Sequence, residues 1–444
     1  MNTPINSQDQ ERVLGVLHSR GLASAQELMH ALGKSQPTVS RLLSSLSGQV
    51  LAMGHARARR YGLPRPIRGQ NARQQLWWTD EQGVQSPLGM LTLLASGVVY
   101  VESPSIQLQP AKELPWFLAP LRAQGFLGRL HARRLVHAGM GADPDLWDLE
   151  STLYSASHLH DAPGAITLGE AARSRVVARL PAPDAGLAAE LDRLAQDVAG
   201  TLPAGSSAGG EQPKFLAVLQ GGQHVLVKFT PPRPSPFGDR WHDLLWAEWL
   251  TGRVLADHGF EVARAGMVQS ARRTYLVSQR FDRTGIAGAT GRRHVLAIGD
   301  VHRAFVADAY SHWAATAAEL QRQRRLSEGD AQRAAALLGF GRLIGNTDMH
   351  SGNLGLMVGL DGLAKGRFQL APVYDMLPMR WKPNPETGGA ADYTPFELER
   401  SPMTQPSLAA ARDYWQRLAG LDTVSARLRA VAAEMARRVA PSGA

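Results

Sequence analysis

The chain has 444 residues, of which 44% are hydrophobic and 20% charged, as expected for a globular protein with about two to four domains. It contains no cysteine, which excludes disulfides, thiolate metal sites and a cysteine nucleophile. No run of about 18 apolar residues occurs, so we expect no membrane partner and a cytoplasmic location. The net charge of +9 indicates an anionic partner. That indication is weakened because nearly all of the 48 basic residues are Arg, a bias that genome base composition can produce.

Residues 1–66 are predicted to form a small independent unit with three helices. Apolar residues at helical spacing run through 8–19, and Ser24 opens a second helix with a capping box. A third helix is expected over 36–46, and two short extended runs with basic residues follow it. This order of helices and basic hairpin is typical of a winged helix-turn-helix, which binds DNA.

The residues expected to contact DNA lie in the third helix and in the basic hairpin, or wing. Small polar and basic side chains there suit base edges and phosphates. They are Gln36, Thr38, Ser40, Arg41, Arg57, Arg59 and Arg60. The alternative is a three-helix module that binds a protein, but the basic wing favours DNA.

Residues 67–200 are predicted to form a mixed α/β subdomain that carries no chemistry by itself. The Pro- and Gly-containing stretch 64–70 resembles a linker. Strands are expected at 77–79 and 97–101, and helices over 114–135 and 187–198.

Residues 201–282 and 283–444 are predicted to form the two lobes of a nucleotide-binding unit. The first lobe should contain a long helix over 240–258 and strands over 215–219, 224–229 and 275–281. The second lobe is largely helical. Strands followed by helices suit a bilobal α+β arrangement with a nucleotide between the lobes.

Lys228 lies at the centre of an apolar strand that follows the Gly- and Ser-rich stretch 205–214. Glycines let backbone amides approach phosphate oxygens, although the stretch lacks the Walker A ending. A strand lysine after such a loop is where a protein kinase places its phosphate ligand, and Glu248 on the next helix is its expected partner. The alternatives are an interdomain loop and a lysine on a solvated strand face.

Asp348 and Asn353 lie five residues apart, and Asp375 follows them after an interval that suits a β-hairpin. We expect the arms of this hairpin at 354–358 and 368–370, on either side of a turn at Asp361. A kinase needs an acid that accepts the hydroxyl proton, and an Asn and a second Asp that hold Mg²⁺. A polar turn is the alternative for this loop alone, but the serial order of all the elements favours a kinase.

Several stretches resemble the HipA-like serine/threonine kinases, the toxin component of bacterial HipBA-type toxin–antitoxin systems. They are 161–166, 207–214, 279–283, 344–353 and 371–375. The resemblance implies a HipA/protein-kinase-like fold, binding of ATP and Mg²⁺, and phosphorylation of a protein hydroxyl.

The resemblance also implies a role for each matching residue. Asp348 would be the catalytic base, assisted by Asn353, and Asn353 and Asp375 would bind Mg²⁺. Gln279 to Phe281 would form the hinge beside the adenine. The full nucleotide-binding set would be Ser207, Gly209, Gly210, Lys214, Lys228, Gln279, Phe281 and His350.

A loop serine of the family is autophosphorylated, which ejects the loop and switches the kinase off. Ser207 matches this serine, and Ser206 would match it after a shift of one residue. The chain departs from the family pattern at Gly352, where a Lys is common, and at Gln279, where an acid is usual. The predicted DNA-binding unit places it in a subgroup of HipA-domain proteins that carry such an N-terminal domain.

The sequence therefore predicts an ATP- and Mg²⁺-dependent serine/threonine protein kinase fused to a winged helix-turn-helix. Its partners would be DNA and a protein substrate, which the resemblance suggests is translation-related. A separate antitoxin stays open. The alternatives are a transcriptional regulator that senses a nucleotide or a partner without phosphoryl transfer, and a small-molecule phosphotransferase.

Overall fold

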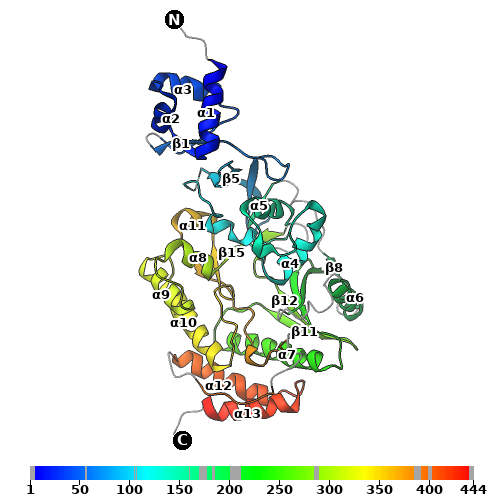
Figure 1. The fold of residues 1–444 in the computed structure, drawn as a ribbon. Coiled ribbons are helices and arrows are strands. Elements are labelled where there is room, and N and C mark those ends of the chain that lie inside the picture. The colour runs from blue at the N-terminus through cyan, green and yellow to red at the C-terminus, as the bar shows by residue number, and fades with distance from the viewer. Residues whose placement is uncertain are drawn as a thin grey trace.

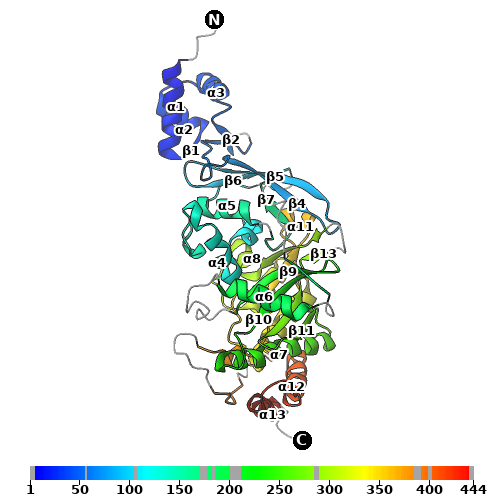
Figure 2. The same ribbon diagram turned by 90° about the vertical axis from the view of Figure 1, so that its right-hand side faces the viewer.

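The N-terminal helices stand at one end of an elongated molecule, and helices α12 and α13 close the other end (Figures 1 and 2). The computed structural model describes residues 6–55, 58–104, 106, 108–159, 161–169, 178–182, 186–200, 212–284, 290–384, 392–398 and 403–439. Across these ranges, no helix combines the length and the apolar character that a membrane crossing requires.

The N-terminal unit has three helices at the predicted places and a three-stranded sheet with the order β1-β3-β2. The predicted capping box is present, because Ser24 and Glu27 each bind the other's backbone N–H. Strand β1 was not expected from the sequence. The elements are α1 (Ser7–Arg20), β1 (Leu22–Ser24), α2 (Ala25–Leu32), α3 (Gln36–Ser45), β2 (Leu51–Met53) and β3 (Arg60–Gly62).

The expectation of a linker over 64–70 is wrong, because this stretch is bound to the middle part of the chain. The N–H of Arg65 donates to the carbonyl of Leu93 at 2.8 Å. The carboxylate of Glu150 pairs with the Arg65 guanidinium and accepts the N–H of Arg68 at 2.9 Å. The sequence pattern missed these contacts because each partner lies 28 or more residues away along the chain.

A small apolar cluster fills the junction between the N-terminal unit and the middle sheet. Leu94 is fully buried in it, and its neighbours come from both sides of the junction. The cluster comprises Met53, Leu94 and Val98, with Leu22, Leu51 and Tyr100 packed against them. The N-terminal unit is therefore docked on the middle part and not merely tethered to it.

The middle part contains a four-stranded sheet with the order β6-β5-β4-β7. The helix expected over 114–135 is divided into a short 3₁₀ segment and α4, and Pro120 lies in the 3₁₀ segment, where a continuous α-helix would be disfavoured. The elements are β4 (Arg73–Thr79), β5 (Gln85–Leu93), β6 (Val99–Glu102), η2 (Trp116–Leu121), α4 (Gly125–Arg134), η3 (Val136–Ala138), η4 (Pro144–Leu146), α5 (Leu149–His158) and β7 (Ile166–Leu168).

The next part is a five-stranded sheet with the order β11-β12-β10-β9-β8, in which β8 and β9 are parallel and the other pairs antiparallel. The predicted strands and both predicted helices of this part are present. The elements are β8 (Ala178–Leu180), α6 (Leu187–Gly200), β9 (Lys214–Leu219), β10 (His224–Phe229), α7 (Pro236–Asp257), β11 (Ala265–Gln269) and β12 (Thr274–Gln279).

The C-terminal part is mainly helical, as predicted. The expected hairpin is correct in its pairing, since β16 and β17 are antiparallel, but helix α11 replaces the tight turn between them. The elements are β13 (Arg283–Thr284), β14 (Gly291–Arg292), β15 (His294–Ala297), α8 (Ile298–Phe305), α9 (Trp313–Arg322), α10 (Glu328–Leu343), β16 (Gly355–Val358), α11 (Leu360–Lys365), β17 (Gln369–Leu370), η7 (Met379–Trp381), α12 (Gln405–Ala419) and α13 (Ala426–Val439).

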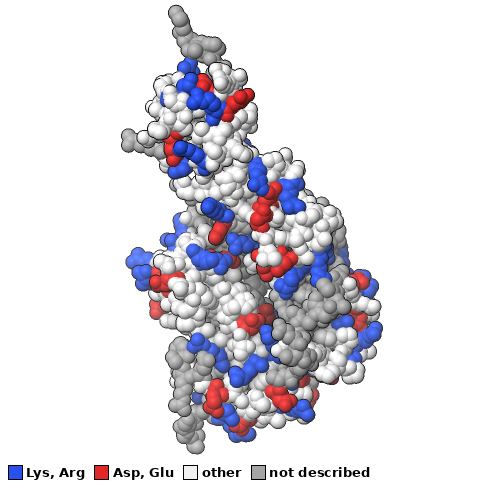
Figure 3. Space-filling view, in the orientation of Figure 1, with Lys and Arg blue, Asp and Glu red and all other residues white. Residues whose placement is uncertain are grey.

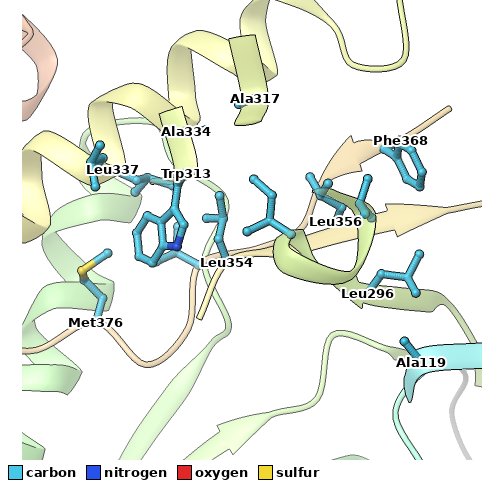
Figure 4. Packing of buried hydrophobic residues seen from close by; sticks show 14 of the residues in the cluster. Ala119, Leu296, Trp313, Ala317, Ala334, Leu337, Leu354, Leu356, Phe368 and Met376 are labelled. Carbon is cyan, nitrogen blue, oxygen red and sulfur yellow. The ribbon is translucent and has the colours of Figure 1, made fainter. Parts of the chain in front are cut away.

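One apolar core joins the middle part to the C-terminal part. Trp313 is fully buried there and lies near Leu337 of α10, Leu354 and Met376 (Figure 4). The same cluster extends from Ile67 to Val439, whereas the sheet β8–β12 has a separate core under α6. Helix α7 packs in the larger core through Ala247, Leu250, Val254 and Leu255, so apolar contacts also join the two lobes.

His294 fixes the segment 161–166 of the middle part against β15. Its ring accepts the N–H of Ala165 at Nδ1 (3.1 Å) and contacts the carbonyl of Phe117 through Nε2 (2.8 Å). Since an N–H must donate and a carbonyl must accept, the imidazole is the neutral Nε2–H tautomer. Gly164 has a φ of +85°, and a Cβ there would lie 2.6 Å from His294 Nδ1. Only glycine fits this close approach.

The docked junction leads to a first prediction. Leu94→Ala should destabilise the junction by about 2–5 kcal/mol, because it removes a fully buried side chain and leaves a cavity. Trypsin should then cleave after Arg68, which precedes Gly69, faster than in the wild type. Val84→Ala is the matched control, because Val84 is 61% exposed. An unchanged cleavage rate in Leu94→Ala would show that the junction is not held in this way.

The buried imidazole leads to a second prediction. Burial lowers the pKa of His294 to about 4 from its ordinary value of 6.5. Between these two values the unfolded chain binds more protons than the folded one, so stability should fall by about 3 kcal/mol as the pH drops from 6.5 to 4. Urea unfolding at stepped pH should show a flatter slope for His294→Gln than for the wild type. The exposed His137→Gln should keep the wild-type slope, and equal slopes for all three proteins would refute the assignment.

Candidate active site

Lys228 is held between two carboxylates that come from distant parts of the chain. Its Nζ lies 2.6 Å from Glu248 Oε1 on α7 and 2.5 Å from Asp375 Oδ1 in the C-terminal part. The alternation of β10 turns Val225 and Val227 into the sheet core and Lys228 towards α7. The predicted partnership of Lys228 and Glu248 is confirmed, and the reading of Lys228 as a solvated side chain is wrong, because it is 4% exposed.

The charges of this cluster depend on one another. Burial alone would lower the pKa of Lys228, but Asp375 and Glu248 outweigh it and raise the pKa above its ordinary value. Burial would raise the pKa of Asp375, but Lys228 and Lys214 lower it to about 2. Burial dominates at Glu248 and raises its pKa. Lys228 and Asp375 are therefore an ion pair at neutral pH.

Asp375 has a left-handed backbone, with a φ of +54°, which is uncommon for a residue other than glycine. Its segment is fixed on one side, because Val373 donates its N–H to Glu261 (2.8 Å) and accepts the N–H of Ala263 (2.9 Å). Backbone strain of this kind is concentrated at functional sites. The strained conformation places the carboxylate of Asp375 on Lys228.

The loop that contains Asp348 and Asn353 runs between α10 and β16 and is organised by its own side chains. Asn346 Oδ1 accepts the N–H of Asp348 at 2.9 Å. The amide of Asn353 donates to the carbonyl of Asp348 at 2.8 Å, which leaves its Oδ1 as the atom available to a metal. Trp313 Nε1 donates to the carbonyl of His350 at 2.9 Å and anchors the loop on the core.

The loop leaves the carboxylate of Asp348 accessible, with 41% of the side chain exposed. His350 Nε2 lies 3.9 Å from Asp348 Oδ1, and His350 Nδ1 accepts the N–H of Gly352 at 2.9 Å. A Cβ at Gly352 would lie 2.7 Å from the His350 ring. The family commonly has Lys at position 352, whereas here the His350 ring packs over Gly352.

A cavity of about 1690 Å³ is lined by the sheet β8–β12, by α7, by the middle part around α4 and by the C-terminal part. The predicted residues that line it are Lys214, Lys228, Gln279, Phe281 and Asp375, together with Glu248. Within the described residues, the cavity wall does not include Asp348, His350 or Asn353. The hydroxyl of Tyr374, which does line the cavity, donates to the carbonyl of Gly352 at 2.9 Å and connects the two sets.

The expected hinge residues lie on the cavity wall at the end of β12. The N–H of Gln279 donates to the carbonyl of Arg264 at 2.7 Å. The ring of Phe281 stands 5.6 Å from the ring of Tyr374, at an interplanar angle of 32°. Two aromatic rings on one wall of the cavity are a suitable environment for a flat base.

A buried ionic cluster behind the hinge was not predicted from the sequence. Arg283 contacts Asp161 and Asp282 at 2.7 Å each, and Arg280 contacts Asp161 at 2.6 Å and Asp282 at 2.9 Å. The N–H of Gly164 donates to Asp282 at 3.0 Å. Burial would raise the pKa of Asp282, but the two arginines reverse this and lower it. The segments 161–166 and 279–283 both resemble the family, and this cluster binds them to each other.

Asp300 is a second residue that the sequence reasoning missed. It lies in the first turn of α8 and lines the same cavity. Burial raises the pKa of Asp300. No local pattern marks it, because an acid in the first turn of a helix is common for reasons of helix stability alone.

The remaining predicted residues fall into two groups. Five of them lie outside the described residues, namely Ser206, Ser207, Gly209, Gly210 and Arg57. The other expected DNA contacts lie on α3 and β3 or beside them, with Thr38 half-buried and the rest exposed, and they are Gln36, Thr38, Ser40, Arg41, Arg59 and Arg60.

The donor set of the site is compatible with Mg²⁺ and a nucleotide. Mg²⁺ prefers oxygen ligands and commonly takes only one or two from the protein, with phosphate and water supplying the rest. Asp375 and Asn353 offer a carboxylate and an amide oxygen. Across the described ranges, no group of three or more His or acidic side chains is arranged to hold a metal. Glu248 Oε2 is buried without a hydrogen-bond partner among the described residues, beside a cavity large enough for a nucleotide.

Comparisons with known proteins agree with this geometry. The family model of the HipA-like C-terminal domain matches residues 206–442, and that of the YjjJ-like toxin middle domain matches residues 70–177. The chain is 34% identical to Toxin YjjJ of Escherichia coli K12 over 433 residues, which is 95% of each protein.

One solved structure shares the fold at low identity. HipA of Shewanella oneidensis MR-1, solved with HipB and operator DNA, superposes with a TM-score of 0.54 and 16% identity over 82% of this chain and 95% of that one. The Helicobacter pylori proinflammatory kinase CtkA gives a TM-score of 0.35 and 12% identity over 52% of this chain and 88% of that one. The two matching family models and the identity along nearly the whole chain show that this protein belongs to the HipA-like family, among its YjjJ-like toxins.

Proposed function

We propose that the chain is an ATP- and Mg²⁺-dependent serine/threonine protein kinase of the HipA toxin type. The observation that carries the proposal is the buried contact of Lys228 with Glu248 and Asp375, which brings a strand, a helix and an expected metal ligand to one cavity. A buried lysine between two acids costs desolvation and is weak evidence of stability. Such a cluster in a cleft is a candidate functional site.

The residues divide the work between binding and proton transfer. Lys228 and Lys214 bind the phosphates, and the adenine lies against the hinge at Gln279 to Phe281. Asp375 and Asn353 would hold Mg²⁺, which neutralises phosphate charge when it is bound. Asp348, which is accessible on its loop, accepts the proton of the attacking hydroxyl.

We further propose that Ser207, or its neighbour Ser206, is an autophosphorylation site. Lys214, seven residues after Ser207, opens β9 and lines the cavity. Seven residues span at most about 25 Å, a chain length that is compatible with phosphoryl transfer to a serine at this position. The protein substrate is a second hydroxyl donor, proposed to be translation-related from the family resemblance.

Residues 1–66 are proposed to be a winged helix-turn-helix that binds DNA. The exposed residues of α3 and β3 support this, and the face of the N-terminal unit in Figure 3 carries several basic side chains. The proposed division of the chain remains 1–66, 67–200, 201–282 and 283–444, and the proposed location is the cytoplasm. A separate antitoxin is a further proposed partner, as HipB accompanies the Shewanella HipA.

The kinase proposal predicts that the purified protein transfers labelled phosphate from ATP in the presence of Mg²⁺ to itself at Ser207 or Ser206, or to a protein in a lysate. Asp348→Asn should lower the rate of transfer by about 10²–10⁴-fold, because the general base is lost, and should keep ATP binding. Asp361→Asn changes an exposed acid on α11 and should behave like the wild type. ATP binding without any transfer would favour a regulator that senses the nucleotide. Transfer to a small molecule alone would favour a small-molecule phosphotransferase.

The DNA proposal predicts that Arg41→Ala combined with Arg59→Ala weakens binding to the protein's own upstream DNA by at least about tenfold. It should also reduce the salt dependence of binding, because two phosphate neutralisations are lost. Arg322→Ala with Arg437→Ala removes the same charge from exposed sites on α9 and α13 and is the control. Electrophoretic mobility shifts at several salt concentrations measure both effects. Equal binding by the two double variants would refute the proposed docking.

A further inference from the structure

Asp300 is an acidic side chain on the cavity wall that the proposed chemistry does not use. It follows β15 and lies in the first turn of α8, and its side chain is 11% exposed. The start of α8 is fixed to the catalytic loop, because Ile298 donates its N–H to Leu354 (2.8 Å) and Gly299 donates its N–H to Ser351 (3.1 Å). Asp300 is therefore held in place relative to the loop that carries Asp348.

Only one oxygen of this carboxylate is bound by the described part of the protein. Arg303, whose side chain is 57% exposed, pairs with Asp300 Oδ1. Across the described residues, Asp300 Oδ2 has no hydrogen-bond partner. Arg122, which follows η2, also lines the cavity, and its positive charge opposes the rise that burial causes in the pKa of Asp300.

Tyr374 gives the position of Asp300 relative to the two ends of the cavity. The ring of Tyr374 pairs with Phe281 at the hinge, and the next residue, Asp375, contacts Lys228 at the phosphate end. Burial raises the pKa of Tyr374, and the charges of Asp375 and Asp300 raise it further. The Tyr374 hydroxyl binds the carbonyl of Gly352, and the N–H of Gly299 binds the carbonyl of Ser351, so α8 meets the loop beside the ring that joins the base end to the phosphate end.

The chemistry of this position narrows what Asp300 can bind. A carboxylate repels a polyphosphate, and an ionised carboxylate accepts hydrogen bonds but donates none. The part of a nucleotide between its base and its phosphates is the ribose, whose hydroxyls are donors. We propose that Asp300 binds the ribose hydroxyls and makes the site selective for ribonucleotides. The inference rests on the proposed nucleotide site and adds a specificity residue to it.

The test measures affinities for Mg²⁺–ATP and Mg²⁺–2′,3′-dideoxy-ATP by calorimetry on the full-length protein. The wild type should bind ATP at least about tenfold more tightly than 2′,3′-dideoxy-ATP, as expected for hydrogen bonds to a charged group. In Asp300→Asn the ratio should fall below about threefold, through weaker ATP binding and unchanged dideoxy binding. Asp308→Asn, an exposed acid on the next loop, should keep the wild-type ratio.

Each other result has a definite meaning. Absence of binding of either nucleotide to the wild type would overturn the proposed nucleotide site itself. Equal affinities in the wild type would refute the role of Asp300 even if Asp300→Asn does not fold. A ratio that persists in a folded Asp300→Asn, or an equal loss for both nucleotides, would assign Asp300 to another role, such as contact with the metal or the substrate hydroxyl. Thermal unfolding of each variant supplies the folding check.

Discussion

The site depends on the position of Lys228 between Glu248 and Asp375. This contact joins β10, α7 and the C-terminal part across the cavity, with both distances at or below 2.6 Å. A buried ion cluster adds little net stability, but removal of one partner leaves an uncompensated charge that costs about 3–5 kcal/mol. The sheet β8–β12 has its own core, whereas α7 packs in the core of the C-terminal part, so this ionic contact ties the sheet to both. A ligand that draws Asp375 or Lys228 away would therefore change how the lobes are joined.

A second set of charges fixes the hinge to the middle part of the chain. Asp161 is held by Arg280 and Arg283, and the N–H of Gly164 binds Asp282. The middle part is in turn docked on the N-terminal unit through the apolar cluster at Leu94. A continuous series of packed contacts therefore runs from the proposed DNA-binding unit to the hinge. Such continuity is a structural route by which the two sites could be coupled. Coupling also requires a structural element with two states whose equilibrium is shifted by binding at each site.

The sequence predicted the features that depend on local patterns. The capping box at Ser24 and the apolar strand around Lys228 are written in adjacent residues, so the elements could be placed within a few positions. The serial order from Lys228 through Asp348 to Asp375 also indicated the site. The partners of Leu94 across the junction and those of Asp161 lie 41 to 122 positions away, a separation that no local period reveals. Asp300 was missed for the same reason, because its importance comes only from the cavity that it faces.

The central claim is that the Lys228 cluster is a Mg²⁺–nucleotide site. The most direct test is the affinity for ATP measured by calorimetry with Mg²⁺ and with EDTA, in the wild type and in Asp375→Asn. We predict that Mg²⁺ strengthens binding to the wild type by at least about tenfold, or about 1.4 kcal/mol, and that Asp375→Asn removes this gain. Equal affinities with and without Mg²⁺, or an unchanged gain in Asp375→Asn, would contradict the account.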